Sequence, residues 1–141
     1  MQPGDRLDDD VQIQVVFSKQ IGNANEANNS LELASITGNK EAIELLVNAN
    51  VDVRLFNNSA LRHAAKDSGK EVIQLLLDAN ADVHAKYEEA LRKAAEFNEN
   101  KEDVVEMLIE ANADIGKAIE KSYHKKKVFD FLMKKFKRHI F

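Results

Sequence analysis

The sequence predicts an all-α protein, a solenoid of stacked helix-turn-helix units joined by short loops. Three observations lead to this fold class. Ala, Leu, Glu and Lys are abundant, whereas the chain has one Pro, five Gly and no Trp, a composition that favours helices over sheets. A similar stretch of sequence returns at an interval of 30 residues. Within each stretch the apolar residues stand three or four positions apart, as they do along one side of a helix.

The 141 residues are enough for one domain with its own core, and we predict a single domain over residues 1–141. The chain has no Cys, which excludes disulfides, thiol nucleophiles and Cys-ligated zinc. Apolar runs are too short to span a bilayer, and the first residues lack the charged and apolar regions of a secretory signal. We therefore expect a cytoplasmic protein.

The first predicted element is a half repeat over residues 10–27. Its apolar residues, 13–17, lie 30 positions before the similar residues 43–47. The three aspartates at 8–10 would cap a helix here and place negative charge at its positive end. We interpret this segment as an N-terminal cap.

Three full repeats follow, over residues 28–56, 57–86 and 87–115. Their first helices carry Leu and Ala three residues apart, and their second helices are apolar on more than one side. The positions that return every 30 residues are Leu31, Leu61 and Leu91, with Ala34, Ala64 and Ala94. Each second helix ends at an Asn (50, 80 or 112), which tolerates the left-handed conformation of a helix stop. The last interval is 32 residues, so repeat three has two extra residues around 97–101.

The final predicted unit, 116–141, is a basic C-terminal cap repeat. It carries nine basic and two acidic side chains, whereas residues 1–115 carry 11 basic and 22 acidic ones. Residues 118–122 align with 90–94, and residues 128–132 align with 72–76. Terminal units of a solenoid are expected to be atypical.

These motifs resemble the ankyrin repeat. Residues 38–46 and 71–77 are similar to its second helix, and residues 81–83 and 113–115 are similar to its closing Ala-Asp-Val. The family's opening Thr-Pro-Leu-His is replaced, for example by Ser59-Ala60-Leu61-Arg62. The 30-residue repeat is also shorter than the common 33, so the family's protruding β-turn finger should become a tight loop. This short variant looks like ankyrin proteins of large DNA viruses, protists and intracellular bacteria.

The resemblance implies a non-catalytic module that binds a partner protein through its concave face. In such stacks the first helices line that face. The first-helix positions outside the apolar stripe, together with an extra aromatic, are Glu32, Ile36, Arg62, Lys66, Arg92, Glu96 and Phe97. We single out Arg62, Arg92 and Phe97, because interfaces concentrate their energy in Arg and aromatic side chains. As surface residues, they are expected to contribute little to fold stability.

Catalysis, cofactors and metals are not expected. The four histidines are far apart, and no zinc, phosphate-loop, esterase or calcium motif occurs. Asp52, Asp82 and Asp114 recur because each ends a repeat. We expect a monomer without enzymatic activity.

The basic tail leaves alternatives open. Its lysines could contact nucleic acid or anionic lipid, form a nuclear-import signal, or cover the solvent side of a capping helix. The candidates for a phosphate contact are Lys125, Lys126, Lys127, Lys134, Lys135 and Lys137. The chain could equally be an assembly cap, a fragment of a longer repeat protein or a host-directed effector, in the nucleus or a host cytoplasm.

Overall fold

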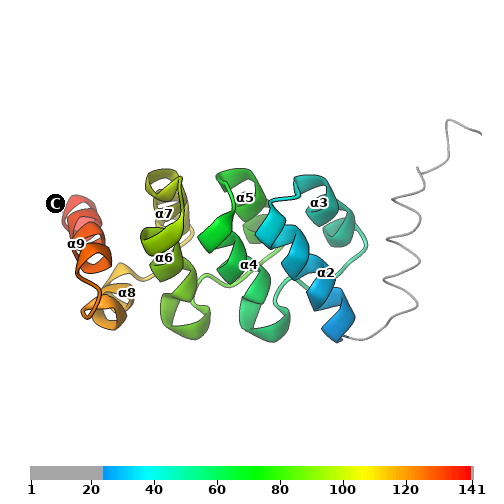
Figure 1. The fold of residues 1–141 in the computed structure, drawn as a ribbon, viewed down its shortest axis with the longest axis horizontal. Coiled ribbons are helices and arrows are strands. Elements are labelled where there is room, and N and C mark those ends of the chain that lie inside the picture. The colour runs from blue at the N-terminus through cyan, green and yellow to red at the C-terminus, as the bar shows by residue number, and fades with distance from the viewer. Residues whose placement is uncertain (1–23, 141) are drawn as a thin grey trace, which may run out of the picture.

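The computed structural model describes residues 24–140, and over this range it is a stack of helix pairs without strands (Figure 1). The predicted half repeat over residues 10–27 falls almost entirely outside the described residues. The helices are α2 (Ala24–Thr37), α3 (Lys40–Asn48), α4 (Leu55–Asp67), α5 (Lys70–Asp78), α6 (Ala85–Phe97), α7 (Lys101–Glu110), α8 (Ile115–Ser122) and α9 (Lys126–Ile140). The prediction of an all-α solenoid is confirmed.

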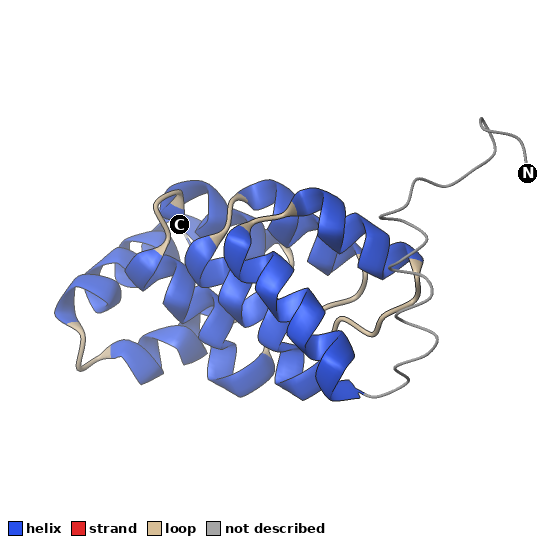
Figure 2. Cartoon of the chain, turned by 45° about the vertical axis from the view of Figure 1, so that its right-hand side comes forward, coloured by secondary structure: helices blue, strands red, loops and turns tan. Residues whose placement is uncertain are grey.

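The helices form two layers that follow the chain order (Figures 1 and 2). The first helices of the repeats, α2, α4, α6 and α8, pack side by side, and the second helices α3, α5 and α7 pack behind them. Helix α9 packs against α8 and α6 and closes the stack. Each helix therefore buries its apolar side against its own partner and against a neighbouring repeat, as a solenoid requires.

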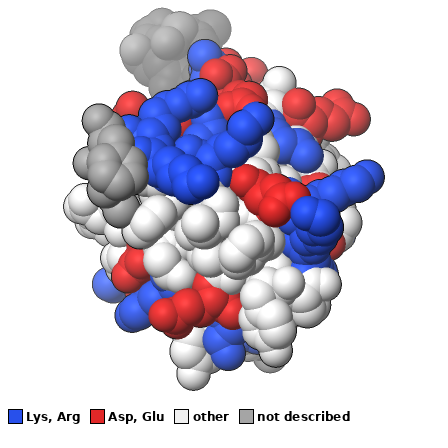
Figure 3. Space-filling model, turned by 90° about the vertical axis from the view of Figure 1, so that its left-hand side faces the viewer, with Lys and Arg blue, Asp and Glu red and all other residues white. Residues whose placement is uncertain are grey.

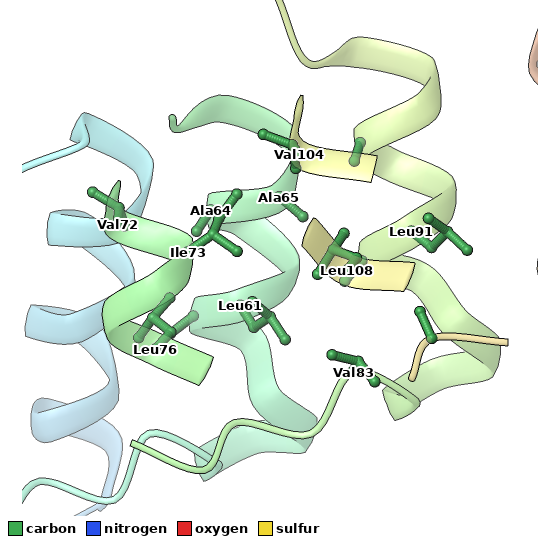
Figure 4. Packing of buried hydrophobic residues seen from close by; sticks show 14 of the residues in the cluster. Leu61, Ala64, Ala65, Val72, Ile73, Leu76, Val83, Leu91, Val104 and Leu108 are labelled. Carbon is green, nitrogen blue, oxygen red and sulfur yellow. The ribbon is translucent and has the colours of Figure 1, made fainter. Parts of the chain in front are cut away.

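One continuous core runs along the stack. Leu61 and Leu91 on the first helices are fully buried, as are Ile73 and Leu76 on α5 (Figure 4). Ala64 stands on α4 with no exposed surface, so a small residue lets the helices of adjacent repeats approach closely. The residues that return every 30 positions are thus the ones that make the core.

The second helices end as predicted. Asn50, Asn80 and Asn112 have φ of 65°, 73° and 76°, in the left-handed region. The amide of the residue after Asn80 then reaches back to the carbonyl of Leu76 at 3.0 Å, and the equivalent bonds form in the other two repeats. This is the hydrogen-bond pattern by which a left-handed residue satisfies the last carbonyls of a helix.

The predicted tight loop between repeats is a left-handed helical turn. Phe56, Asn57 and Asn58 have φ of 52–59° at the start of α4, and residues 86–88 repeat this at the start of α6 with φ of 54–61°. The right-handed helix begins only after these residues. Consecutive left-handed residues cost roughly 1–2 kcal/mol each unless Gly, so other contacts must hold them.

The two extra residues of repeat three are divided between a loop and a helix. The α6–α7 loop has three residues, 98–100, where the α4–α5 loop has two, 68 and 69. Helix α7 has 10 residues, whereas α5 has 9. The insertion therefore widens the turn beside Phe97 and lengthens the second helix by one residue.

Candidate functional site

The candidate site is the surface of the first helices. Glu32 and Ile36 lie on α2, Arg62 and Lys66 on α4, and the last three predicted residues, 92, 96 and 97, on α6. Helix α4 packs against α2 on one side and α6 on the other, so the structure brings these residues into neighbouring rows. We call this the first-helix surface.

Most charged groups of the first-helix surface pair with residues of a neighbouring repeat. The Glu32 carboxylate lies 3.0 Å from Nδ1 of His63 on the next helix. Arg62 pairs with Glu89 of the following repeat, and Nζ of Lys125 donates to both oxygens of Glu96 at 2.8 and 2.9 Å. Glu32, Arg62 and Glu96 therefore connect neighbouring repeats as well as facing the surface.

Arg62 and Arg92 also hold the left-handed turns. The Arg62 guanidinium donates to the carbonyls of Asn57 at 3.0 Å and Phe56 at 3.2 Å. Arg92 donates in the same way to the carbonyls of Lys86 and Tyr87, both at 2.9 Å. Each arginine thus satisfies carbonyls that a right-handed helix would have used. The expectation that these two side chains contribute little to stability does not agree with this geometry.

Glu89 has an altered acidity because of Arg62. Partial burial disfavours its charged form, but the hydrogen bond and charge of Arg62 outweigh burial and lower the pKa of Glu89. Both side chains are mostly shielded from solvent, at 15% and 22% exposure. This pair is therefore a fixed contact between repeats two and three.

Phe97, unlike Arg62 and Arg92, does not hold a turn of the fold. The residue is 47% exposed at the end of α6. The ammonium groups of Lys66 and Lys93 lie 5.0 and 5.3 Å from the ring centroid, within the range of cation–π attraction. An exposed aromatic ring between two cations is the strongest candidate contact on this surface.

A hollow and an apolar pair extend the first-helix surface to either side of Phe97. A hollow of about 240 Å³ lies between the α4–α5 and α6–α7 loops, lined by Lys66 and Phe97 among others. Towards the N-terminal end, Ile36 and Leu33 of α2 are 42% and 63% exposed. The sequence analysis identified Ile36 but not Leu33 or Lys93.

The basic tail is partly neutralised by the repeats beneath it. Lys135 is buried against α7, where it pairs with Glu102 and lies 3.1 Å from Glu106. Burial disfavours its charge, but these carboxylates outweigh burial and raise the pKa of Lys135. Lys126 pairs with Asp130 at 2.9 Å. With Lys125 paired to Glu96, three of the six predicted phosphate contacts have carboxylate partners.

A larger hollow lies beside this tail. It measures about 420 Å³ and is lined by Lys101, residues 125–127 and the apolar side chains of Ala95, Val128 and Phe131. Glu96 also lines the hollow, and its carboxylate forms an ion pair with Lys125. The hollow is thus lined by both basic and apolar side chains.

Sequence reasoning missed three buried polar side chains that fix the repeats. Asn58 and Glu88, in the left-handed turns, accept hydrogen bonds from the amides of Asp82 and Asp114 at the end of the same repeat, at 2.7 and 3.0 Å. Asn98 donates to two carbonyls of the preceding repeat. The signal was a polar residue at a fixed distance from each Leu of the first helices, but nothing in the sequence marked it as buried.

None of the helices within residues 24–140 combines the length and the apolar character needed to cross a membrane. Among these residues, no group of three or more His, Asp or Glu side chains could hold a metal ion.

Comparison with known proteins identifies the repeats. The family model described as ankyrin repeats (3 copies) matches residues 11–87 and again residues 31–119. Searches of curated proteins and of solved structures gave no match. The family matches span most of the chain and agree with the stacked helix pairs and helix stops described above. The chain belongs to the ankyrin repeat family.

Proposed function

We propose that the protein binds another protein through the first-helix surface and carries out no catalysis. Ankyrin repeats are in general modules for protein–protein interaction, and the family is typically non-enzymatic. The observation that carries the proposal is Phe97, half-exposed between two lysines. A partner that covers this ring would bury an aromatic side chain at the centre of its contact, as energetically dominant interface residues do.

The predicted residues have two different roles: some can contact a partner, and others hold the shape of the surface. Phe97, Lys66 and Ile36 offer surface to a partner. Arg62 and Arg92 act mainly by fixing the left-handed turns, so their effect on binding would come through the shape of the surface. We therefore place the centre of the interface at Phe97 and not at the arginines.

A pull-down from the native cell type followed by titration calorimetry tests the proposal. Phe97→Ala should weaken binding of the captured partner by at least about 1 kcal/mol. Gln74→Ala, an exposed substitution on a second helix, is the matched control and should leave affinity unchanged. Loss of affinity in the Gln74 variant with none in the Phe97 variant would place the interface on the second helices and refute the proposal.

The alternative, a nucleic-acid or anionic-lipid adaptor acting through the basic tail, has less support. Lys125, Lys126 and Lys135 already pair with carboxylates. Phosphate contacts need unpaired cations, and their number sets the salt dependence of binding. Only the remaining lysines of the predicted set, Lys127, Lys134 and Lys137, would serve that role.

A further inference from the structure

The C-terminal end of the stack exposes a position that every preceding repeat buries. In the repeat register, Phe129 of α9 corresponds to Ile43, Ile73 and Val105, all of which have no exposed surface. Figure 4 shows Ile73 on the side of α5 that faces Leu108 of the next repeat. Phe129 is only half-buried and lies outside the core cluster, and no repeat within residues 24–140 covers it.

Met133 extends this apolar position along the same helix. It stands four residues after Phe129, so both side chains lie on one side of α9. Like Phe129, it is half-buried and does not belong to the core cluster. Val128 and Leu132, by contrast, are buried against the preceding repeat. The outer side of α9 is therefore an apolar ridge of two large side chains.

Basic side chains surround this ridge. Lys137 stands four residues after Met133 and so lies on the same side of α9. Lys134 and Arg138 lie on the adjoining side of the helix, and all three residues are exposed. Within residues 24–140 none of these three has an ion-pair partner, unlike Lys135 and Lys126. Figure 3 shows Lys and Arg gathered on this end of the molecule beside a field of uncharged residues.

We propose that this end surface, made of Phe129, Met133, Lys134, Lys137 and Arg138, binds an acidic amphipathic helix of a partner protein. The helix would lie where the next repeat of a longer stack would pack. Its apolar side would cover the ridge, and its carboxylates would meet the three cations. The proposal concerns a different surface from the first-helix surface and does not depend on it.

The apolar ridge favours an acidic amphipathic helix over other anionic partners. Nucleic acid would use the cations but would leave Phe129 and Met133 without a contact. A membrane-surface helix would need its main apolar side free to enter the lipid, whereas Val128 and Leu132 are already buried in the core. A partner helix needs only an exposed ridge and complementary charge.

Fluorescence anisotropy on the full chain tests the proposal with synthetic peptides about five turns long. One peptide is an amphipathic helix with Leu on one side and Glu elsewhere, and a second has the same composition in scrambled order. At about 0.15 M salt, the amphipathic peptide should bind at least about ten-fold more tightly than the scrambled one, a difference of about 1.4 kcal/mol. A peptide with Lys in place of Glu should show no binding.

Two sets of variants locate the site. The triple variant Lys134→Glu, Lys137→Glu, Arg138→Glu should lower the affinity for the amphipathic peptide by at least about ten-fold. Phe129→Ala should also lower this affinity. The control variant Lys40→Glu, Lys70→Glu changes charge at the starts of α3 and α5 and should have no effect. Thermal melts by circular dichroism establish that each variant is folded.

Several results would overturn the proposal. Equal affinity for the two acidic peptides would mean that charge alone is recognised. Tighter binding of duplex RNA or phosphatidylserine vesicles, in competition with the peptide, would assign the surface to phosphate or lipid. A dimer in light scattering that Phe129→Ala dissociates would assign it to a second copy of the chain. Unchanged peptide affinity in the triple variant would place the binding elsewhere.

Discussion

The Asn58 side chain accepts a hydrogen bond from the backbone amide of Asp82 at 2.7 Å, and so joins the left-handed turn at the start of a repeat to the backbone that follows its second helix. Glu88 and Asp114 make the same connection one repeat later. At the opposite end of the helices, Asn98 donates back to the preceding repeat. Polar contacts therefore close each repeat on itself at one end of its helices and join it to the preceding repeat at the other.

Replacing Asn98 by Ala should lower the free energy of unfolding by about 2–3 kcal/mol, because two buried carbonyls would lose their donor. These are the carbonyls of Ala65 and Ser68, at 2.7 and 2.8 Å from the Asn98 amide. Urea denaturation measures the loss. Asn100→Ala, an exposed substitution in the same loop, is the control and should stay within about 0.5 kcal/mol of wild type. Equal stability of the two variants would contradict the bonding role of Asn98.

Arg92→Ala should destabilise the fold by about 1–2 kcal/mol, because its guanidinium satisfies two carbonyls of the left-handed turn. The arginine of the corresponding position in repeat two, Arg62, should behave in the same way. Arg54→Ala removes an exposed arginine whose ion pair with Asp52 is 3.5 Å long, and should change stability little. Chemical denaturation of the three variants provides the measurement. An Arg92 variant as stable as the Arg54 variant would show that the turn does not depend on the Arg92 hydrogen bonds.

The helix stop at Asn80 predicts opposite effects of two substitutions. Asn80→Gly should be neutral or stabilising, because Gly has no Cβ to crowd a φ of 73°. Asn80→Val should destabilise, because a β-branched side chain resists positive φ. Thermal unfolding of both variants checks this prediction. If their midpoints coincide, the left-handed assignment is wrong.

Packing between repeats should tolerate neither larger nor smaller side chains. Ala64→Leu places a larger side chain where Ala64 has no exposed surface and should cost roughly 1–3 kcal/mol. Leu76→Ala should cost about 2–5 kcal/mol, because it leaves a cavity in a fully buried site. Urea melts of both variants give the values. Near wild-type stability in both would be incompatible with the stacked core.

Acid should weaken the attachment of α9. Burial disfavours the Glu106 carboxylate, but Lys135 and His139 outweigh this and lower the pKa of Glu106 below 4.5. Its contribution to stability is therefore complete above pH 4.5 and is lost as pH falls through the lower folded-state pKa. Glu89, whose pKa is lowered beside Arg62, adds to the same loss.

Thermal melts over the acid range measure this dependence. Wild type should lose stability below pH 4.5, and Glu106→Gln should lose less over the same range, because its amide does not titrate. Lys135 sets the alkaline limit of stability. Because its folded-state pKa is raised, its contribution to stability is complete below pH 10.5 and is lost as the pH rises through the higher folded-state value. Parallel acid curves for wild type and Glu106→Gln would show that this carboxylate is not linked to folding.

The sequence predicted the parts of the fold that depend on periodicity. Leu61 and Leu91 identify the core because one apolar position per repeat must face the neighbouring helices. Asn80 marks a helix stop because few residue types accept positive φ. Both inferences rest on local chemistry that repeats, and each repeat supplies an independent check on the others.

The left-handed turns and the roles of the arginines could not be predicted in the same way. Residues 56–58 and 86–88 share little sequence, and Phe, Lys and Tyr do not favour left-handed backbone. Their conformation depends on Arg62 or Arg92 several residues later and on an amide more than 20 residues away, at the end of the same repeat. Such contacts exist only after the repeat has folded. Likewise, nothing local shows that Lys135 is buried while Lys134 beside it is exposed.

The coupling of each repeat to the next has a mechanical consequence. Asn98 donates to the preceding repeat and Arg62 pairs with the following one, so the bonds between repeats act in series along the stack. A chain stretched from its two ends would give way one repeat at a time. Each event would release 30 residues in the regular repeats, about 100 Å of extended backbone. The molecule would therefore lengthen under load in steps of nearly equal size.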